Sequence, residues 1–224
     1  MIYITGDTHI PIDVKKLNTK NFPDQKELCK DDYFIICGDF GGVWNNDREE
    51  LYWRKWLDNK NFTTLFVDGN HENFNLLNEF EVVDFCGGKA HKISNSIYHL
   101  MRGQIYEIDR KNIFSFGGAS SHDKAFRKKD ISWWEEELPS EAELEFARKK
   151  LEKVNWQVDY VITHCAPTSV QLTIDPDFKS DKLTDFFDIL KNDLLYNCWY
   201  FGHYHIDRII DNNFRCLFGE IIQI

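Results

Sequence analysis

Aspartate, asparagine and histidine residues recur in this 224-residue sequence in short polar groups whose composition suits a metal site. The candidate ligands in these groups are Asp7, His9, Asp39, Asn70, His164, His203 and His205. Carboxylate and amide oxygens combined with imidazole nitrogens suit divalent ions of intermediate hardness, such as Mn²⁺, Fe²⁺, Zn²⁺ or Co²⁺. In Asp-x-His and His-x-His, residues i and i+2 of an extended segment share a face, so each pair can direct two ligands to one ion. A carboxylate has two oxygens, so one aspartate can also bridge two ions.

Each polar group follows a short apolar run that is typical of a strand. These runs cover residues 2–5, 33–37, 64–67, 160–163 and 199–201. Functional groups in open α/β sheets gather at the carboxyl ends of strands, so we expect the groups to converge there. Taken singly, each aspartate or asparagine is equally explained by turn and cap chemistry, and each histidine by ordinary hydrogen bonding. Their recurrence at five strand ends favours a shared metal site.

Helical patterns lie between several of these runs. They predict helices over residues 47–57, 140–154 and 184–195. The second of these helices opens with a capping box formed by Ser140 and Glu143. Closely spaced strands are expected over residues 97–116, and a hairpin over residues 206–218. We therefore predict an α/β fold in which a β-sandwich is flanked by helices, as one domain over residues 1–224.

Composition excludes several classes of protein. The net charge of −10 argues against electrostatic binding of duplex nucleic acid over a large surface. Bound metal ions can still supply the positive charge that attracts a single phosphate group. No run of about 18 apolar residues is present, so we expect no membrane span. The first residues read as a strand rather than a leader peptide. The six cysteines form no C-x-x-C pair, and we expect small, buried, free thiols in a cytoplasmic protein.

The five polar groups together resemble the calcineurin-like metallophosphoesterase family in both identity and order. The blocks D-x-H, G-D, G-N-H-[DE], H and G-H-x-H of that family stand here at residues 7–9, 38–39, 69–72, 164 and 202–205. The resemblance implies a two-sheet β-sandwich flanked by helices, with the metal site at the carboxyl ends of strands. It also implies an enzyme that hydrolyses phosphate esters. Residues 38–44, 115–119 and 130–135 resemble in particular the small phosphoesterases of Firmicutes and their phages, a likeness that fixes no single substrate.

The resemblance also implies a role for each residue that matches the blocks of the family. One ion would be held by Asp7, His9, Asp39 and His205, and a second by Asp39, Asn70, His164 and His203, with Asp39 bridging. Manganese is the first expectation, with iron, zinc, nickel or cobalt as alternatives. Two cations about 3.5–4 Å apart can hold a hydroxide that attacks phosphorus in line, because coordination lowers the pKa of water. His71 would not be a ligand: with Asp39 it is a predicted catalytic residue, assisting the leaving oxygen, and the alternative is a purely structural role.

One block departs from the pattern of the phosphoprotein-phosphatase branch, which extends G-D to G-D-x-x-D-R-G. Gly42 stands where that branch has the aspartate that supports the catalytic histidine, and Val43 replaces the arginine. Asp39 is intact, so metal binding should survive the change. The departure speaks against a Ser/Thr protein phosphatase, and it leaves open what orients His71.

Residues 119–138 form an irregular stretch that could flank the metal site. In one hypothesis His122, Arg127 and Lys128 contact substrate there while an aromatic residue stacks on a base. The alternative is a solvated basic loop with two tryptophans, Trp133 and Trp134, in the core.

The leading prediction of function is a phosphoesterase that acts on a small phosphorylated molecule or a nucleotide, either as a monoesterase or as a diesterase. A nuclease on single-stranded nucleic acid, a Ser/Thr protein phosphatase and a non-catalytic binding protein of the same fold are the alternatives, in that order. A non-catalytic protein would be expected to lack a ligand or His71, and here all are present. Oligomeric state and native metal are not set by the sequence.

Overall fold

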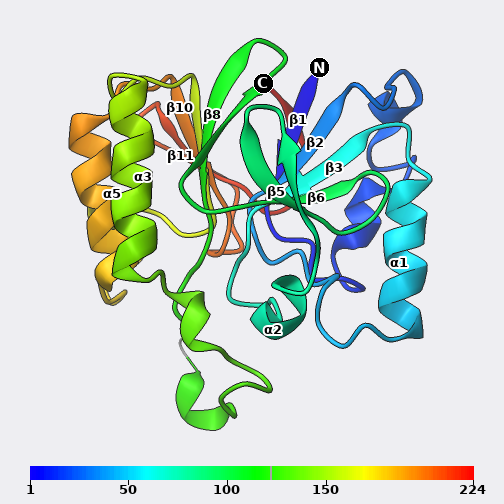
Figure 1. The fold of residues 1–224 in the computed structure, drawn as a ribbon, viewed down its shortest axis with the longest axis horizontal. Coiled ribbons are helices and arrows are strands. Elements are labelled where there is room, and N and C mark those ends of the chain that lie inside the picture. Colours follow the sequence, from blue (N-terminus) through cyan, green and yellow to red (C-terminus); the bar gives the residue numbers. More distant parts are fainter. Residues whose placement is uncertain (122) are drawn as a thin grey trace.

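Two β-sheets pack face to face between layers of helices in the computed structural model, which describes residues 1–121 and 123–224 (Figure 1). The first sheet has the strand order β13-β1-β2-β3-β6-β5-β4, and the second has the order β11-β12-β10-β9-β8-β7. The strands are β1 (Ile2–Thr5), β2 (Tyr33–Ile36), β3 (Thr63–Phe66), β4 (Val82–Phe85), β5 (Gly88–Lys92), β6 (Ile97–Leu100), β7 (Gln104–Ile108), β8 (Lys111–Phe116), β9 (Tyr160–Thr163), β10 (Cys198–Phe201), β11 (Arg208–Ile210), β12 (Phe214–Cys216) and β13 (Ile222–Gln223). The predicted α/β sandwich is confirmed.

Helices cover the outer face of each sheet, with α1 beside the first sheet and α3 and α5 beside the second (Figure 1). The α-helices are α1 (Arg48–Asp58), α2 (Phe74–Leu77), α3 (Glu141–Lys153), α4 (Thr168–Ile174) and α5 (Lys182–Asp193). Short 3₁₀ helices cover Val14–Leu17, Pro23–Lys26, Lys124–Phe126 and Glu135–Glu137. The predicted capping box opens α3, because Ser140 accepts from the N–H of Glu143. Helix α5 begins earlier than predicted, because Asp181 is its N-cap and accepts two backbone N–H groups.

Alternate residues of the central strands enter different cores, and this fixes their register. In β2, Phe34 and Ile36 pack on the side of α1, whereas Ile35 lies between the sheets. In β10, Trp199 packs on the side of α3 and α5, whereas Tyr200 lies between the sheets. A slip of one residue would exchange the two faces of such a strand, so the packing holds each strand end in place.

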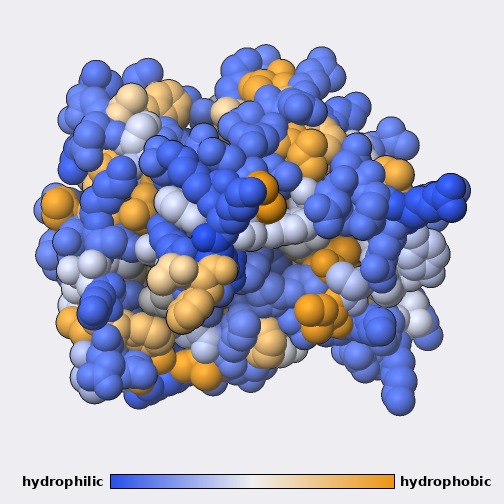
Figure 2. Space-filling model, turned by 90° about the horizontal axis from the view of Figure 1, so that it is seen from below, coloured by the Kyte–Doolittle hydropathy of each residue, from blue (hydrophilic) through white to orange (hydrophobic). Residues whose placement is uncertain are grey.

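The parallel strands bring their carboxyl ends to one edge of the sandwich. Thr5 of β1 pairs with Ile36 of β2, and Ile36 with Phe66 of β3. In the second sheet Ile162 of β9 pairs with Tyr200 of β10. Figure 2 shows the face of the molecule that is at the bottom in Figure 1. This face is mostly hydrophilic, and its hydrophobic side chains form small, scattered groups.

All six cysteines are free thiols, as expected, but they are not all buried. Cys37, Cys165 and Cys216 are buried, whereas Cys29 is exposed. The prediction of buried thiols is therefore wrong for Cys29, which lies in a loop before β2 rather than in a strand. Within the described part of the chain, no helix is both long enough and apolar enough to cross a membrane.

Candidate metal centre

The first predicted ligand group assembles at the ends of β1 and β10. The candidate ligand atoms of Asp7, His9 and His205 all lie within 4.8 Å of one another. Nε2 of His205 is 3.1 Å from Oδ2 of Asp7, and this buried oxygen has no hydrogen-bond partner. A buried carboxylate oxygen without a hydrogen bond is costly, and a cation held by these three side chains would remove that cost. The residues present therefore fit a divalent ion.

The second group lies at the ends of β2, β3 and β9. Nε2 of His164 is 3.3 Å from Oδ1 of Asp39 and 3.3 Å from Oδ1 of Asn70. The opposite ring nitrogen, Nδ1, donates a hydrogen bond of 2.8 Å to the carbonyl oxygen of Cys37. That bond leaves Nε2 free to act as a ligand. The ring of His203 packs against His164 at a centroid distance of 4.9 Å, which brings the fourth predicted residue to the same place.

Asp39 lies between the two groups and is buried. Its Oδ2 is 3.2 Å from Nε2 of His9, whereas its Oδ1 is 3.3 Å from Nε2 of His164. Oδ1 also accepts the backbone N–H of His71 at 2.8 Å, which fixes the carboxylate. Nδ1 of His9 is 2.9 Å from Asp13, whose carboxylate orients the ring. Each oxygen of Asp39 thus faces a different ligand group, an arrangement that would allow the carboxylate to bridge two ions.

Glycines precede several ligands because a side chain at those positions would displace a carboxylate. A Cβ atom at Gly69 would stand 2.5 Å from the backbone nitrogen of Asp39 and closer still to its Oδ1. A Cβ atom at Gly202 would stand 2.7 Å from the carbonyl oxygen of Cys37 and would also overlap Oδ1 of Asp7. Contacts below 3.0 Å essentially never occur for real Cβ atoms. The glycines of the G-N-H and G-H-x-H blocks therefore allow the turns to approach the aspartates.

Four of the predicted ligands have a left-handed backbone. The φ angles are 34° at His9, 46° at Asp39, 69° at His203 and 52° at His205. Such conformations cost about 1–3 kcal/mol each in residues other than glycine, and they gather at functional sites where the surroundings enforce them. The strain is consistent with turns that are shaped to direct side chains toward a common point.

The carboxylates of this centre require compensating positive charge. Burial alone would raise the pKa of Asp39, but the neighbouring His164 and His9 hold it well below its usual range. Burial would lower the pKa of His164, yet Asp39 and Asp7 raise it to about 10. The aspartates thus favour protons on the imidazoles, and divalent ions would supply the same charge and displace those protons.

His71 lies beside the centre and is half-buried. Its ring is 5.5 Å from the ring of His9, and its Nε2 lies 3.5 Å from Nη2 of Arg127. Burial lowers the pKa of His71, and the positive charge of Arg127 lowers it further. A ligand atom of His71 also lies within 4.8 Å of those of His9 and Asp39, so the ring can reach a group bound at the metals.

A family model for calcineurin-like phosphoesterases matches residues 1–207 of the chain. The chain belongs to this family. The family assignment confirms the resemblance carried by the five blocks, and it makes the protein, in general terms, a metal-dependent phosphoesterase. No curated protein matches the chain.

The turn that carries His71 is held without the aspartate that the phosphoprotein-phosphatase branch has at the position of Gly42. A Cβ atom at Gly42 would stand 2.5 Å from the ring of Phe40, so this position leaves no room for an aspartate without rearrangement. The buried carboxylate of Glu72 instead accepts the backbone N–H groups of Phe40 and Gly41, at 2.8 and 3.2 Å. Glu72 thereby ties the turn after β2 to the turn that carries His71.

Of the two predicted substrate contacts that the structure describes, Arg127 lies at the centre and Lys128 does not. Nε of Arg127 pairs with Asp123 at 2.6 Å, and Nη1 donates to the carbonyl oxygen of Ser132 at 3.2 Å. Lys128 is exposed, and its backbone forms the turn that contains Ser132. His122 lies outside the described residues. Of the two tryptophans, Trp134 is in the core, as the alternative predicted, whereas Trp133 is only half-buried.

A buried polar network that includes His91 and His99 lies behind the G-N-H block and was not predicted from the sequence. Asp68 accepts hydrogen bonds from Nε of Arg102 at 2.9 Å and from Nε2 of His99 at 3.0 Å. Nδ1 of His99 in turn lies 2.9 Å from Nδ1 of His91. The network anchors the residue next to Gly69, so it holds the turn that presents Asn70 and His71.

Lys16 was also missed, although it supports the other ligand group. Its Nζ donates to the backbone carbonyls of Gly6, Asp7 and Phe218. The ring of Phe218 stacks on His205 at a centroid distance of 4.7 Å. Lys16 thus joins the turn after β1 to the segment that supports His205. A lysine in a polar stretch gives no sequence signal for such a role.

Proposed function

We propose that this protein hydrolyses a phosphate mono- or diester of a small phosphorylated molecule or a nucleotide, using two divalent metal ions. The observation that carries the proposal is Asp39, whose two oxygens face separate ligand groups. Asp7, His9 and His205 would hold one ion with Asp39, and Asn70, His164 and His203 would hold the other. The mixture of oxygen and nitrogen ligands suits manganese first, and iron, zinc, nickel or cobalt next.

The bound ions would supply Lewis acidity, which polarises a phosphoryl group and makes water a nucleophile at neutral pH. The side chains around them position the ester and serve the leaving group. Arg127 is placed to hold a phosphoryl oxygen, because its guanidinium lies beside His71 and is itself fixed by Asp123. In an in-line displacement the leaving oxygen departs opposite the attacking water, and His71 gives it a proton. Burial and Arg127 lower the pKa of His71, so a proton that it carries is readily released.

The alternative functions have less support from the residues. A protein phosphatase of the G-D-x-x-D-R-G type needs an aspartate where Gly42 is packed against Phe40. A nuclease needs cationic surface for a strand, whereas this chain has a net charge of −10. A non-catalytic role gives no reason for the converging ligands and for His71 beside them.

The proposal is tested with metal-stripped protein and matched chromogenic phosphate mono- and diesters. Mn²⁺, Ni²⁺, Zn²⁺ or Mg²⁺ is restored separately, and hydrolysis is measured with each. We expect hydrolysis that depends on the added metal, and the ratio of mono- to diester rates assigns the enzyme to one class. A protein that binds two ions but hydrolyses neither ester with any metal would contradict the proposal and favour a binding function.

A further inference from the structure

A cavity of about 350 Å³ lies next to His71. Its lining includes the segment of residues 10–12, and a second group of lining residues consists of Trp44, Asn45, Asp47, Glu49 and Glu50. His9 and His71 also line it, so the cavity borders both the metal centre and the histidine that is proposed to serve the leaving group. Whatever is attached to the leaving oxygen has this space available to it.

The cavity combines apolar surface with negative charge. Trp44 presents a half-exposed indole whose ring is 6.4 Å from that of His71, and Ile12, which also lines the cavity, is 72% exposed. Asp47, Glu49 and Glu50 also line the cavity, whereas none of its lining residues in the described chain is a lysine or an arginine. An additional anionic group beside these carboxylates would face their negative charge, with no lysine or arginine among the described lining residues to offset it.

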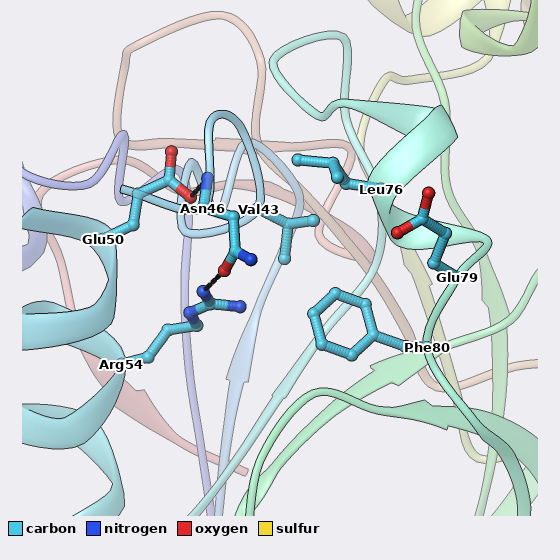
Figure 3. A pocket seen from close by; sticks show the side chains of 7 residues that line it. All are labelled: Val43, Asn46, Glu50, Arg54, Leu76, Glu79 and Phe80. Carbon is cyan, nitrogen blue, oxygen red and sulfur yellow. Dashed lines mark hydrogen bonds between the residues drawn. The ribbon is translucent and has the colours of Figure 1, made fainter. Parts of the chain in front are cut away.

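Side chains of α1 hold the segment that carries Trp44. Glu50 accepts the backbone N–H groups of Trp44, Asn45 and Asn46, at 3.1, 2.6 and 2.9 Å. Arg54 donates to the side-chain oxygen of Asn46, and Figure 3 shows Glu50 and Arg54 extending from α1 toward this segment. These contacts fix the position of the indole before any ligand arrives, which lowers the entropic cost of binding.

The indole itself is anchored by the core. Trp44 packs edge-on against the buried Trp134 at a centroid distance of 5.2 Å. Its backbone carbonyl accepts a hydrogen bond of 2.7 Å from Nδ2 of Asn73, which lies two residues beyond His71. The ring that lines the cavity is therefore tied to the same turn as the catalytic histidine.

On the basis of the proposed function, we propose that this cavity is the leaving-group subsite and that it selects an uncharged or cationic alcohol with a planar ring. The phosphoryl end belongs at the metal ligands and Arg127, so the alcohol extends past His71 into the cavity. There its ring stacks on Trp44, while the carboxylates exclude leaving groups that carry a second phosphate or a carboxylate. A nucleoside has this chemistry, whereas an oligonucleotide strand or a polyphosphate does not.

The role of Trp44 is tested with benzyl phosphate and ethyl phosphate, whose leaving alcohols are similarly basic and differ in the ring. Stacking on an aromatic side chain contributes about 1–3 kcal/mol, so we expect kcat/KM for the benzyl ester to exceed that for the ethyl ester by about fivefold or more. In Trp44→Ala the ratio should fall toward one, and in Trp44→Phe it should be largely kept. The ratio is independent of the fraction of active protein. A ratio that Trp44→Ala leaves unchanged would overturn the stacking role.

The role of charge is tested with benzyl phosphates that carry a 4-carboxylate or a 4-aminomethyl group. We expect the carboxylate to lower kcat/KM relative to the parent ester, and the aminomethyl group to maintain or raise it. Glu49→Gln should reduce the discrimination against the carboxylate. Glu152→Gln on the distant helix α3 removes the same charge and should leave that discrimination as it is. Equal rates for all three esters in the wild-type protein would overturn charge selection.

Failure of the proposed function and failure of the subsite give different results. If metal-loaded protein hydrolyses none of these esters and no chromogenic ester, the proposed phosphoesterase function fails. If it hydrolyses benzyl, ethyl and substituted benzyl phosphates with the same kcat/KM, the function stands and the subsite is refuted.

Discussion

Replacing Gly69 by alanine probes how closely the turn carrying His71 must approach Asp39. The added Cβ would stand 2.5 Å from the backbone nitrogen of Asp39 and nearer to its Oδ1, whereas ordinary contacts begin at 3.4 Å. Asp39 must therefore move by about 1 Å, and a misplacement of that size costs about 100-fold in rate when it affects reacting groups. Overpacking of this kind also costs about 1–3 kcal/mol of stability. We expect folded protein with reduced metal content and a kcat lowered by about 100-fold or more.

Gly88→Ala is the matched control, since its Cβ would stand 2.7 Å from the ring of Tyr106. Gly88 lies in the hairpin of β4 and β5, far from the predicted metal ligands. It should lose comparable stability in thermal unfolding while keeping its metals and its kcat. Metal per chain is counted in both variants, and kcat is measured on a chromogenic ester. If Gly69→Ala keeps both metals and a kcat within a few-fold of the wild type, the metal centre does not depend on the close approach of the turn at Gly69 to Asp39.

Three further substitutions test separate parts of the molecule. Asp39→Asn should weaken binding of both metals and abolish turnover, and unchanged metal content would argue against a bridging carboxylate. His71→Ala should keep both metals and lower kcat, most for esters with poor leaving groups, and normal turnover of such esters would remove His71 from the mechanism. Burial, with the neighbouring His99, lowers the pKa of His91 to about 4 from 6.5, so between these values the unfolded chain binds a proton that the folded chain does not. The free energy of unfolding should therefore fall as pH drops through this range, by about 2 kcal/mol more in the wild type than in His91→Gln. Equal acid sensitivity of the two proteins by urea unfolding would contradict this.

The fold and the ligand groups could be predicted because their signals are local. Each ligand follows directly on an apolar run, and parallel pairing brings such strand ends together without any further information. Helix α3 was predicted by Ser140 and Glu143, a cap that acts over three residues. The loop cation Arg127 was also predicted, although its contact with His71 depends on the path of residues 119–138.

The supporting contacts could not be predicted because they join distant parts of the chain. Asp68 meets Arg102 across 34 residues, and Lys16 meets Phe218 across 202. Their pairing depends on which strands become neighbours, and β3 lies beside β6 through a crossover that no local pattern indicates. The position of Trp44 beside His71 could not be predicted either, because it depends on contacts with Glu50 and Trp134.

The most direct test of a two-metal phosphoesterase is a titration of the metal-stripped protein with Mn²⁺, in which bound metal per chain and ester hydrolysis are measured on the same samples. Hydrolysis is expected to rise with metal content and to reach its maximum at two ions per chain, as Asp39 between two ligand groups requires. Full activity without metal, or a maximum at one ion per chain, would contradict the two-metal centre.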